Sequence, residues 1–151
     1  MGPVSPNLHF IVKPAIWAAD AATLRAIRFR VFVEEQGVPL ELECDEEDER
    51  CAHALVFAPD DTAVGTGRLL SDGRIGRLAV YKEWRGQGAG NALMKYFLNL
   101  ARGRGLTSVK LHAQTRATAF YARHGFEAHG EVFMDAGIPH VEMSRFLETS
   151  K

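Results

Sequence analysis

The chain has 151 residues, of which 46% are hydrophobic and 25% are charged, and its formal net charge is −1. This length and composition predict a single soluble domain spanning residues 1–151, with a hydrophobic core of ordinary size. A net charge near zero creates no overall field toward nucleic acid or a membrane surface, so we expect neither as a partner.

The two cysteines and the start of the chain bear on its compartment. Cys44 and Cys51 lie in an acidic stretch without metal-site spacing, so we expect reduced thiols and no bound metal. The first ten residues lack the basic region and long apolar run of a signal peptide. No apolar stretch approaches membrane-spanning length. These features predict a cytoplasmic protein.

The first predicted elements are a strand over residues 8–13 and a helix. Asp20 is expected to cap the helix that follows it, and Gly37 followed by Pro39 predicts its end. Apolar residues at helical spacing predict one buried face. These residues are Leu24, Ile27, Val31 and Phe32.

Residues 41–49 contain seven of the nineteen acidic residues in the chain. A block of like charge usually remains in water, so this segment is interpreted as a solvated loop. The alternative is a negatively charged surface beside a binding site.

Three strands are predicted next, over residues 52–58, 63–70 and 75–80, with turns at Pro59-Asp60-Asp61 and Ser71-Asp72-Gly73. The third strand contains a conflict of phase, because Ile75 is apolar on one face while Leu78 and Val80 are apolar on the other. A β-bulge between the two sets would reconcile them. A bulge also leaves backbone groups available to a ligand.

A glycine-rich turn, Arg85-Gly86-Gln87-Gly88-Ala89-Gly90, precedes a predicted helix. Helix starts attract anions, and glycines let a phosphate approach the backbone closely. The turn lacks the Lys-Ser/Thr of a P-loop, which argues against a nucleotide-binding module, and its third glycine comes one place early for a dinucleotide fingerprint. The alternative is a loop that binds nothing. The helix has five apolar residues on one face: Leu93, Tyr96, Phe97, Leu100 and Ala101.

The remaining elements are a strand over 108–113, a short helix over 115–124 and a closing hairpin of strands 126–134 and 138–146. The order β-α-β-β-β-α-β-α-β-β predicts an α/β domain. We expect a mixed, mostly antiparallel central sheet with helices on both faces.

The turn Arg85-x-x-Gly88-x-Gly90 between a strand and a helix resembles the acyl-CoA pyrophosphate loop of the GNAT superfamily of N-acetyltransferases. A second block has the family's order and separation: Leu111-His112-Ala113-Gln114, Ala117, and Phe120-Tyr121-Ala122-Arg123-His124-Gly125-Phe126. The resemblance implies a sheet splayed between the fourth and fifth strands, with acetyl-CoA as acyl donor in the gap and no metal.

Further segments resemble the bacterial ElaA-like branch of this superfamily, and the likeness covers about residues 25 to 143. Met134, Ala136 and Glu34 depart from its pattern. The matching segments are Val31-Phe32-Val33-x-Glu35-Gln36, Pro39, Glu43-x-Asp45-x-x-Asp48, His53, Ala113-Gln114, Phe120-Tyr121 and Gly137-Ile138-Pro139-His140.

The resemblance implies a cofactor site built from the fourth strand, the glycine-rich turn and the second block. The main chain of Leu78, Ala79 and Val80 would hold the pantetheine arm. The other expected cofactor residues are Arg85, Gly86, Gln87, Gly88, Ala89, Gly90, Asn91, Gln114 and Phe120.

Acetyl transfer to an amine needs a proton donor for the leaving thiolate and a base for the amine. Tyr121 matches the family's donor. The base remains open among Glu35, His53, His112, His140 and water, and His140 is our choice because it would approach the cleft from the final hairpin.

The resemblance places the acceptor beside Glu35, Gln36 and His53, where a carboxylate would attract a cationic amine. We expect the acceptor to be a small-molecule amine or a protein amino group. The alternative function is a non-catalytic acyl-CoA-binding or sensory module. A homodimer remains open.

Overall fold

The computed structural model describes residues 9–43 and 45–148. Cys51 is a free cysteine, whereas Cys44 and the predicted start of the first strand at Leu8 lie outside the described residues. In these two ranges, no helix is both long enough and apolar enough to cross a membrane.

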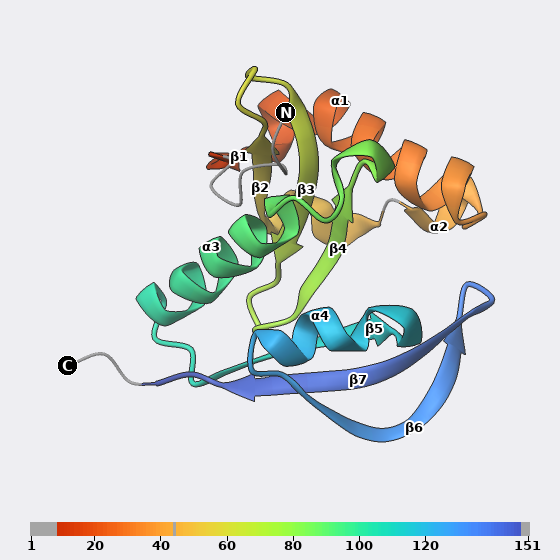
Figure 1. The fold of residues 1–151 in the computed structure, drawn as a ribbon, viewed down its shortest axis with the longest axis vertical. Helices are drawn as coiled ribbons and strands as arrows, with labels where there is room; N and C mark the ends of the chain where they lie inside the picture. The colour runs from red at the N-terminus through yellow and green to blue at the C-terminus, as the bar shows by residue number, and fades with distance from the viewer. Residues whose placement is uncertain (1–8, 44, 149–151) are drawn as a thin grey trace, which may run out of the picture.

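The strands form two antiparallel sheets instead of one continuous sheet (Figure 1). The first has the order β1-β2-β3-β4 and the second the order β5-β7-β6. Where β4 and β5 approach, they share an isolated parallel bridge between Arg74 and Lys110, and the Lys110 N–H donates to the Gly73 carbonyl at 3.1 Å. The expected separation between the fourth and fifth strands is confirmed. The bounds are β1 Ile11–Ala15, β2 Ala52–Phe57, β3 Ala63–Leu69, β4 Ile75–Val80, β5 Ser108–Gln114, β6 Glu127–Asp135 and β7 Ile138–Phe146.

Helices cover both faces of the first sheet (Figure 1). Helix α1 (Trp17–Arg28) contacts β3 and β4, α3 (Ala89–Gly103) contacts β1 to β5, and α4 (Thr118–Arg123) contacts β5 and β6 of the second sheet. The α/β architecture is therefore as expected. The short helices are η1 Phe29–Glu35, α2 Leu40–Glu43, η2 Glu46–Arg50, η3 Lys82–Trp84 and η4 Thr115–Ala117.

Strand β2 shows how the core is divided. Its side chains Ala54 and Val56 belong to the larger hydrophobic cluster, which includes α3, whereas Leu55 belongs to the smaller cluster with α1. Successive strand residues point to opposite faces, and both faces of this sheet are covered. This double burial explains why β2 is apolar without interruption from Ala54 to Phe57.

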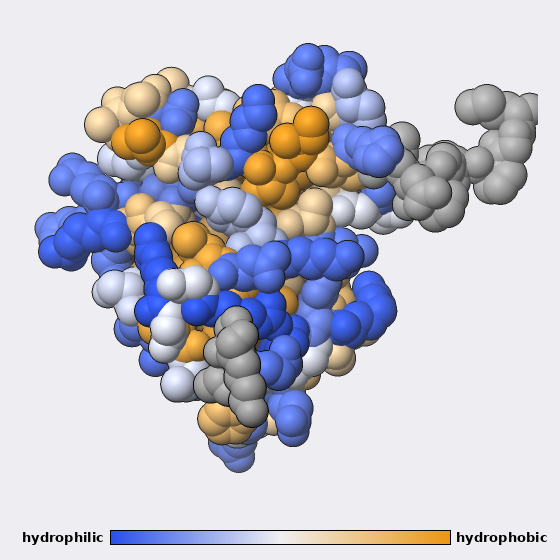
Figure 2. All heavy atoms as spheres, turned by 90° about the vertical axis from the view of Figure 1, so that its left-hand side faces the viewer, coloured by the Kyte–Doolittle hydropathy of each residue, from blue (hydrophilic) through white to orange (hydrophobic). Residues whose placement is uncertain are grey.

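The outer surface is mixed in character. On the face shown in Figure 2, hydrophobic residues form separate patches between hydrophilic ones. Such scattered apolar exposure is normal for folded domains, and it assigns no interaction surface here.

The first helix differs from its prediction at its start and agrees with it at its end. It begins at Trp17, and Asp20 lies in its first turn, where its carboxylate accepts a hydrogen bond from the Ile16 N–H at 2.8 Å. The prediction that Asp20 is the N-cap is therefore wrong, although this side chain still satisfies a backbone donor at the helix start. At the other end the helix continues as the π-helix η1 before Gly37, whose φ of +75° is left-handed. The expected glycine stop is confirmed.

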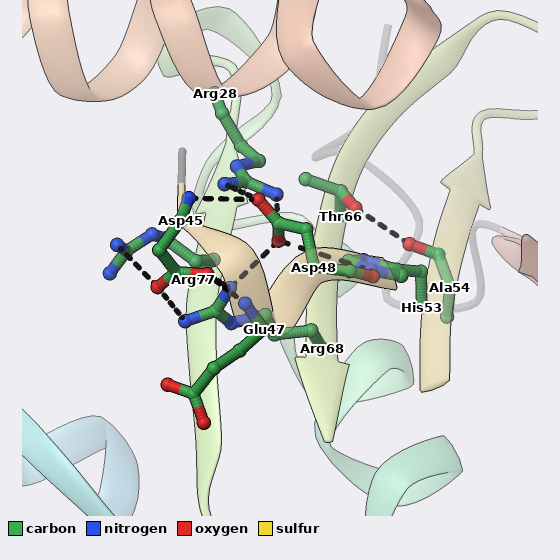
Figure 3. A network of polar contacts seen from close by, with 9 residues as sticks. All are labelled: Arg28, Asp45, Glu47, Asp48, His53, Ala54, Thr66, Arg68 and Arg77. Carbon is green, nitrogen blue, oxygen red and sulfur yellow. Dashed lines mark hydrogen bonds and ion pairs between the residues drawn. The ribbon is translucent and has the colours of Figure 1, made fainter. Parts of the chain in front are cut away.

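The acidic segment also differs from its prediction. Asp48 is 1% exposed, and its carboxylate accepts from Arg28 at 2.9 and 3.1 Å and from Arg68 at 2.7 Å (Figure 3). Asp45 accepts from Arg68 at 2.8 Å with each oxygen. The interpretation as a solvated loop is wrong for Asp48, because arginines on α1 and β3 supply the charges that compensate for its burial, whereas Asp45 remains exposed and is held by its ion pair.

Burial would push the pKa of Asp48 upward, but the hydrogen bonds and charges of Arg28 and Arg68 outweigh it and hold this pKa below its usual value. Asp45 also caps η2, accepting from the Glu47 N–H at 3.1 Å, while Asp48 accepts from the Asp45 N–H at 3.3 Å. The reciprocal cap and the ion pairs together fix this segment against the first sheet.

Candidate active site

Strand β4 contains the bulge that its sequence predicts. Thr66 of β3 pairs with Ala79 and Arg68 pairs with Gly76, so that two residues of β4, Arg77 and Leu78, lie opposite one residue of β3. Arg77 has a φ of +51°, which is left-handed and unusual for a residue with a side chain. The bulge removes main-chain groups from the regular ladder along the edge where the sheets separate.

A glycine on β3 accommodates this bulge. A Cβ at Gly67 would lie 2.7 Å from the Phe97 ring of α3 and 2.8 Å from the Leu78 side chain. The close approach of these groups requires glycine at this position. The bulge is therefore supported by contacts with both β3 and α3.

A cleft of about 680 Å³ lies between the two sheets. Its lining comes mainly from β4, β5, β7, η1, η4 and Tyr121 of α4, with single residues of β3, η2 and β6. Nine of the residues proposed from the sequence for cofactor binding, catalysis or acceptor binding line it. They are Gln36, Leu78, Ala79, Val80, Arg85, His112, Gln114, Tyr121 and His140.

The glycine-rich turn lies at the start of α3. Gly86 and Gly88 have φ values of +76° and +110°, and Gly88 is the N-cap of the helix. The N–H groups of a first helical turn have no partner within the helix, so they are suited to an anion. Gly90 allows α3 to pack closely against Phe120, since a Cβ at this position would lie 3.3 Å from the Phe120 ring.

Other residues of this turn have polar contacts of their own. The Gln87 side chain donates to the Glu83 carbonyl at 3.1 Å, and Asn91 Oδ1 lies 2.8 Å from His124 Nε2. Phe120 packs edge-on against Tyr121, with ring centroids 5.1 Å apart. The turn, the start of α3 and α4 therefore form one packed unit beside the cleft.

Arg85 and Glu35 form an ion pair. The guanidinium donates to the two carboxylate oxygens at 2.5 and 2.7 Å, and Arg85 Nε donates to the Val80 carbonyl at 2.9 Å. These hydrogen bonds hold the pKa of Glu35 below its usual value. A carboxylate with a lowered pKa is a weak base, which disfavours Glu35 among the candidates for that role.

The three candidate histidines occupy different environments. His53 lies outside the cleft lining, where it is buried and donates from Nε2 to the Asp48 carbonyl at 2.7 Å, and burial lowers its pKa. His112 lines the cleft and packs edge-on against Phe133 at 5.0 Å. The placement of His53 gives it a structural contact within the fold instead of access to an acceptor.

His140 lines the cleft, and its Nδ1 donates to the Ile138 carbonyl at 2.7 Å. A carbonyl only accepts hydrogen bonds, so the proton of the neutral ring resides on Nδ1 and Nε2 keeps its lone pair. The ring also stacks on Phe133 at 6.0 Å. His140 is thus a fixed imidazole with one nitrogen able to accept a proton.

Tyr121 lines the same cleft, and burial raises its pKa to about 12. The hydroxyl is therefore protonated throughout the neutral range. Transfer of its proton to a thiolate, whose thiol has a reference pKa of about 8.5, would be uphill. Tyr121 is consequently better suited to donating a hydrogen bond to developing negative charge than to releasing its proton early.

Gln36 and Gln114 connect the two sides of the cleft. The Gln114 side chain donates to Gln36 Oε1 at 2.8 Å, and Arg116 Nε donates to Gln114 Oε1 at 3.0 Å. The cleft is also lined by Arg68, Arg74 and Arg77, which we did not single out from the sequence. The only feature of the sequence that pointed to this part of the cleft was the conflict of phase in β4, which predicted the bulge but not the arginines.

Comparison with known proteins places this geometry in a family. A family model described as "Acetyltransferase (GNAT) domain" matches residues 19–147. The chain is 39% identical over 123 residues to YjcF of Bacillus subtilis (strain 168), named as an uncharacterized N-acetyltransferase, covering 79% of this chain and 87% of that protein.

Solved structures agree. An acyl-CoA N-acyltransferase from Pseudomonas aeruginosa is 33% identical, with a TM-score of 0.78, covering 92% of this chain and 99% of that one. ElaA of Escherichia coli is 28% identical, with a TM-score of 0.79, covering 91% of this chain and 99% of that one.

Proposed function

Because this chain belongs to the GNAT family of acetyltransferases, and is thus an acyltransferase, we propose that it transfers an acetyl group from acetyl-CoA to a primary amine of a small molecule or a protein. The observation that carries this proposal is the cleft between β4 and β5, which brings a bulged strand, Tyr121 and His140 together. Its lining combines main-chain groups with a proton donor and a proton acceptor.

The residues beside the cleft fit a CoA donor. The start of α3, with left-handed Gly86 and Gly88, suits the pyrophosphate, and Arg85 adds a positive charge. The main chain of Ala79 and Val80, along the cleft, suits the amides of the pantetheine arm. The donor would supply an activated thioester. Arg85 is paired with Glu35 in this structure, so a phosphate would compete with that carboxylate.

His140 and Tyr121 would divide the proton chemistry between them. His140 Nε2 would accept the proton that the amine must lose as the amide bond forms. The Tyr121 hydroxyl would hydrogen-bond the sulfur as the thioester bond breaks, and it would deliver a proton only once negative charge has developed there. Glu35 has no proton-transfer role in this scheme, because Arg85 holds it ionised.

The test measures binding and turnover separately. Calorimetry should detect acetyl-CoA binding, and an amine panel with thiol-release detection should detect turnover. Tyr121→Phe should lower kcat by about 10²-fold, with acetyl-CoA affinity about unchanged. Tyr96→Phe, which removes the hydroxyl of a half-buried tyrosine on α3, is the matched control.

Each outcome has a distinct meaning. Wild-type turnover in Tyr121→Phe would exclude Tyr121 as the donor. His140→Ala should lower kcat by about 10²-fold with acetyl-CoA affinity about unchanged, and wild-type turnover in this variant would exclude His140 as the base. Acetyl-CoA binding without turnover of any amine would favour the non-catalytic module.

A further inference from the structure

The cleft is lined by an arginine, Arg74, whose Nε has no hydrogen-bond partner among the described residues. This arginine lies just before β4, and its Nε is buried. A guanidinium stays protonated at any working pH, and a buried donor without an acceptor is unfavourable. This position therefore calls for an acceptor atom that the described chain does not supply.

The backbone next to Arg74 brings a second arginine to the same cleft. Arg77 lies at the bulge, lines the cleft and contacts Asp45 at 3.5 Å. Its left-handed φ of +51° is a local strain. Such outliers gather at ligand sites, where the strained backbone aims a side chain.

Three carboxylates in or near the cleft are already paired with arginines. Asp45 and Asp48 accept short hydrogen bonds from Arg68, and Asp48 also pairs with Arg28. Glu35 is paired with Arg85. Glu35, which the sequence suggested would attract a cationic amine, is thus matched by an arginine.

The balance of charge along the cleft is positive. Within the described chain, its lining includes five arginines and three acidic residues. The arginines are Arg68, Arg74, Arg77, Arg85 and Arg116, and the acidic residues are Asp45, Glu47 and Asp135.

We propose that the acceptor carries an anionic group, a carboxylate in the first instance, which Arg74 binds with Arg77 beside it. The planar fork of a guanidinium matches the two oxygens of a carboxylate. The amine of the same acceptor would then lie toward His140 in the same cleft. This inference rests on the proposed function and specifies its acceptor as an amino-acid-like molecule.

The experiment compares acceptors that differ only in the anionic group. The probes are the twenty protein amino acids and their C-terminal amides, together with O-phosphoethanolamine and ethanolamine. Thiol release from acetyl-CoA gives kcat/KM for each. Binding of each probe is also measured by NMR in the presence of desulfo-CoA, a readout that needs no turnover.

At least one amino acid should exceed its amide in kcat/KM and affinity by about tenfold or more, the usual effect of a charged hydrogen bond. Arg74→Gln should abolish most of that preference while leaving acetyl-CoA affinity unchanged, and Arg74→Lys should restore part of it. The matched control is Arg102→Gln, which changes an arginine at the end of α3 that contacts Glu148 at 3.5 Å.

Two results would overturn the inference. The first is that amides equal the acids in kcat/KM and affinity with the wild-type protein. The second is that the preference for acids survives Arg74→Gln. A larger effect for O-phosphoethanolamine than for any amino acid would replace the carboxylate with a phosphate. Turnover confined to uncharged or cationic amines would sink this inference and leave the proposed acetyl transfer standing. Selective binding of acids without any turnover would support the anion site and contradict the proposed acetyl transfer.

Discussion

Two arginine–carboxylate pairs in this molecule share one geometry and differ in environment. Arg28 and Asp48 meet through two hydrogen bonds behind the first sheet, and both side chains are 1% exposed. Arg85 and Glu35 also share two hydrogen bonds, but they lie beside the cleft and their side chains are 38% and 30% exposed. Removing one partner of a buried pair typically costs about 3–5 kcal/mol, against about 0–1 kcal/mol at the surface.

The difference separates a structural pair from an exchangeable one. The buried pair fastens η2 to α1 and, through Arg68, to β3. The pair beside the cleft holds its arginine where a phosphate would need it, and water reaches both partners. The same two residue types therefore serve the fold in one place and are available to a ligand in the other.

The largest expected effect comes from breaking the buried pair. Asp48→Asn keeps the shape but removes the charge facing Arg28 and Arg68, so the free energy of unfolding should fall by about 3–5 kcal/mol. Urea unfolding monitored by circular dichroism measures it.

The control is Glu83→Gln, which breaks the exposed pair with Arg30, whose side chains are 51% and 52% exposed. This variant should lose far less stability than Asp48→Asn, because water screens an exposed pair. Equal losses in the two variants would show that burial does not distinguish these pairs.

A smaller effect is expected in acid, where Asp45 connects the two regions. Hydrogen bonds from Arg68 lower the pKa of Asp45 from 3.8 to about 2. The folded state therefore holds the proton less tightly than the unfolded chain. The resulting stability is complete above about pH 4 and disappears as the pH falls through about 2.

Asp45→Asn should remove this contribution, so the urea midpoint of the variant should fall less between about pH 5 and pH 2.5 than that of the wild type. Parallel curves for the two proteins would contradict the assignment. The effect should be modest, because the Asp45 side chain is 34% exposed and partly screened.

The smallest effect is expected at the pair beside the cleft. Glu35→Gln should change stability by less than about 1 kcal/mol and release Arg85 toward the donor, so acetyl-CoA affinity should rise by up to about fivefold. Calorimetry measures the affinity, and Arg85→Gln should weaken it. Weaker binding in Glu35→Gln would mean that Glu35 positions Arg85 instead of competing for it.

Much of the fold was predictable because its signals are local. The bulge in β4 follows from the phase of Ile75, Leu78 and Val80 within one strand, and the helix stop follows from Gly37. The cleft between β4 and β5 was expected through family resemblance, which carries long-range information that periodicity lacks.

The errors concern contacts between distant residues. Asp48 was assigned to solvent because its partner Arg28 lies 20 positions away, and Glu35 meets Arg85 across 50 positions. No local pattern encodes either pairing. The Asp20 prediction failed differently, since an aspartate in the first turn can also stabilise a helix start, by accepting from the N–H of the N-cap residue.

A single hydrophobic cluster lies under both sheets. It contains Leu69 and Ile75 of the first sheet, Leu111 and Met143 of the second, and Phe97 of α3. A packed interior transmits changes of volume instead of absorbing them. The angle between the two sheets, and with it the width of the cleft, is therefore set by the volume of buried side chains that no substrate touches. A methylene added to or removed from that cluster would change the spacing between Arg74 and His140 without altering either residue.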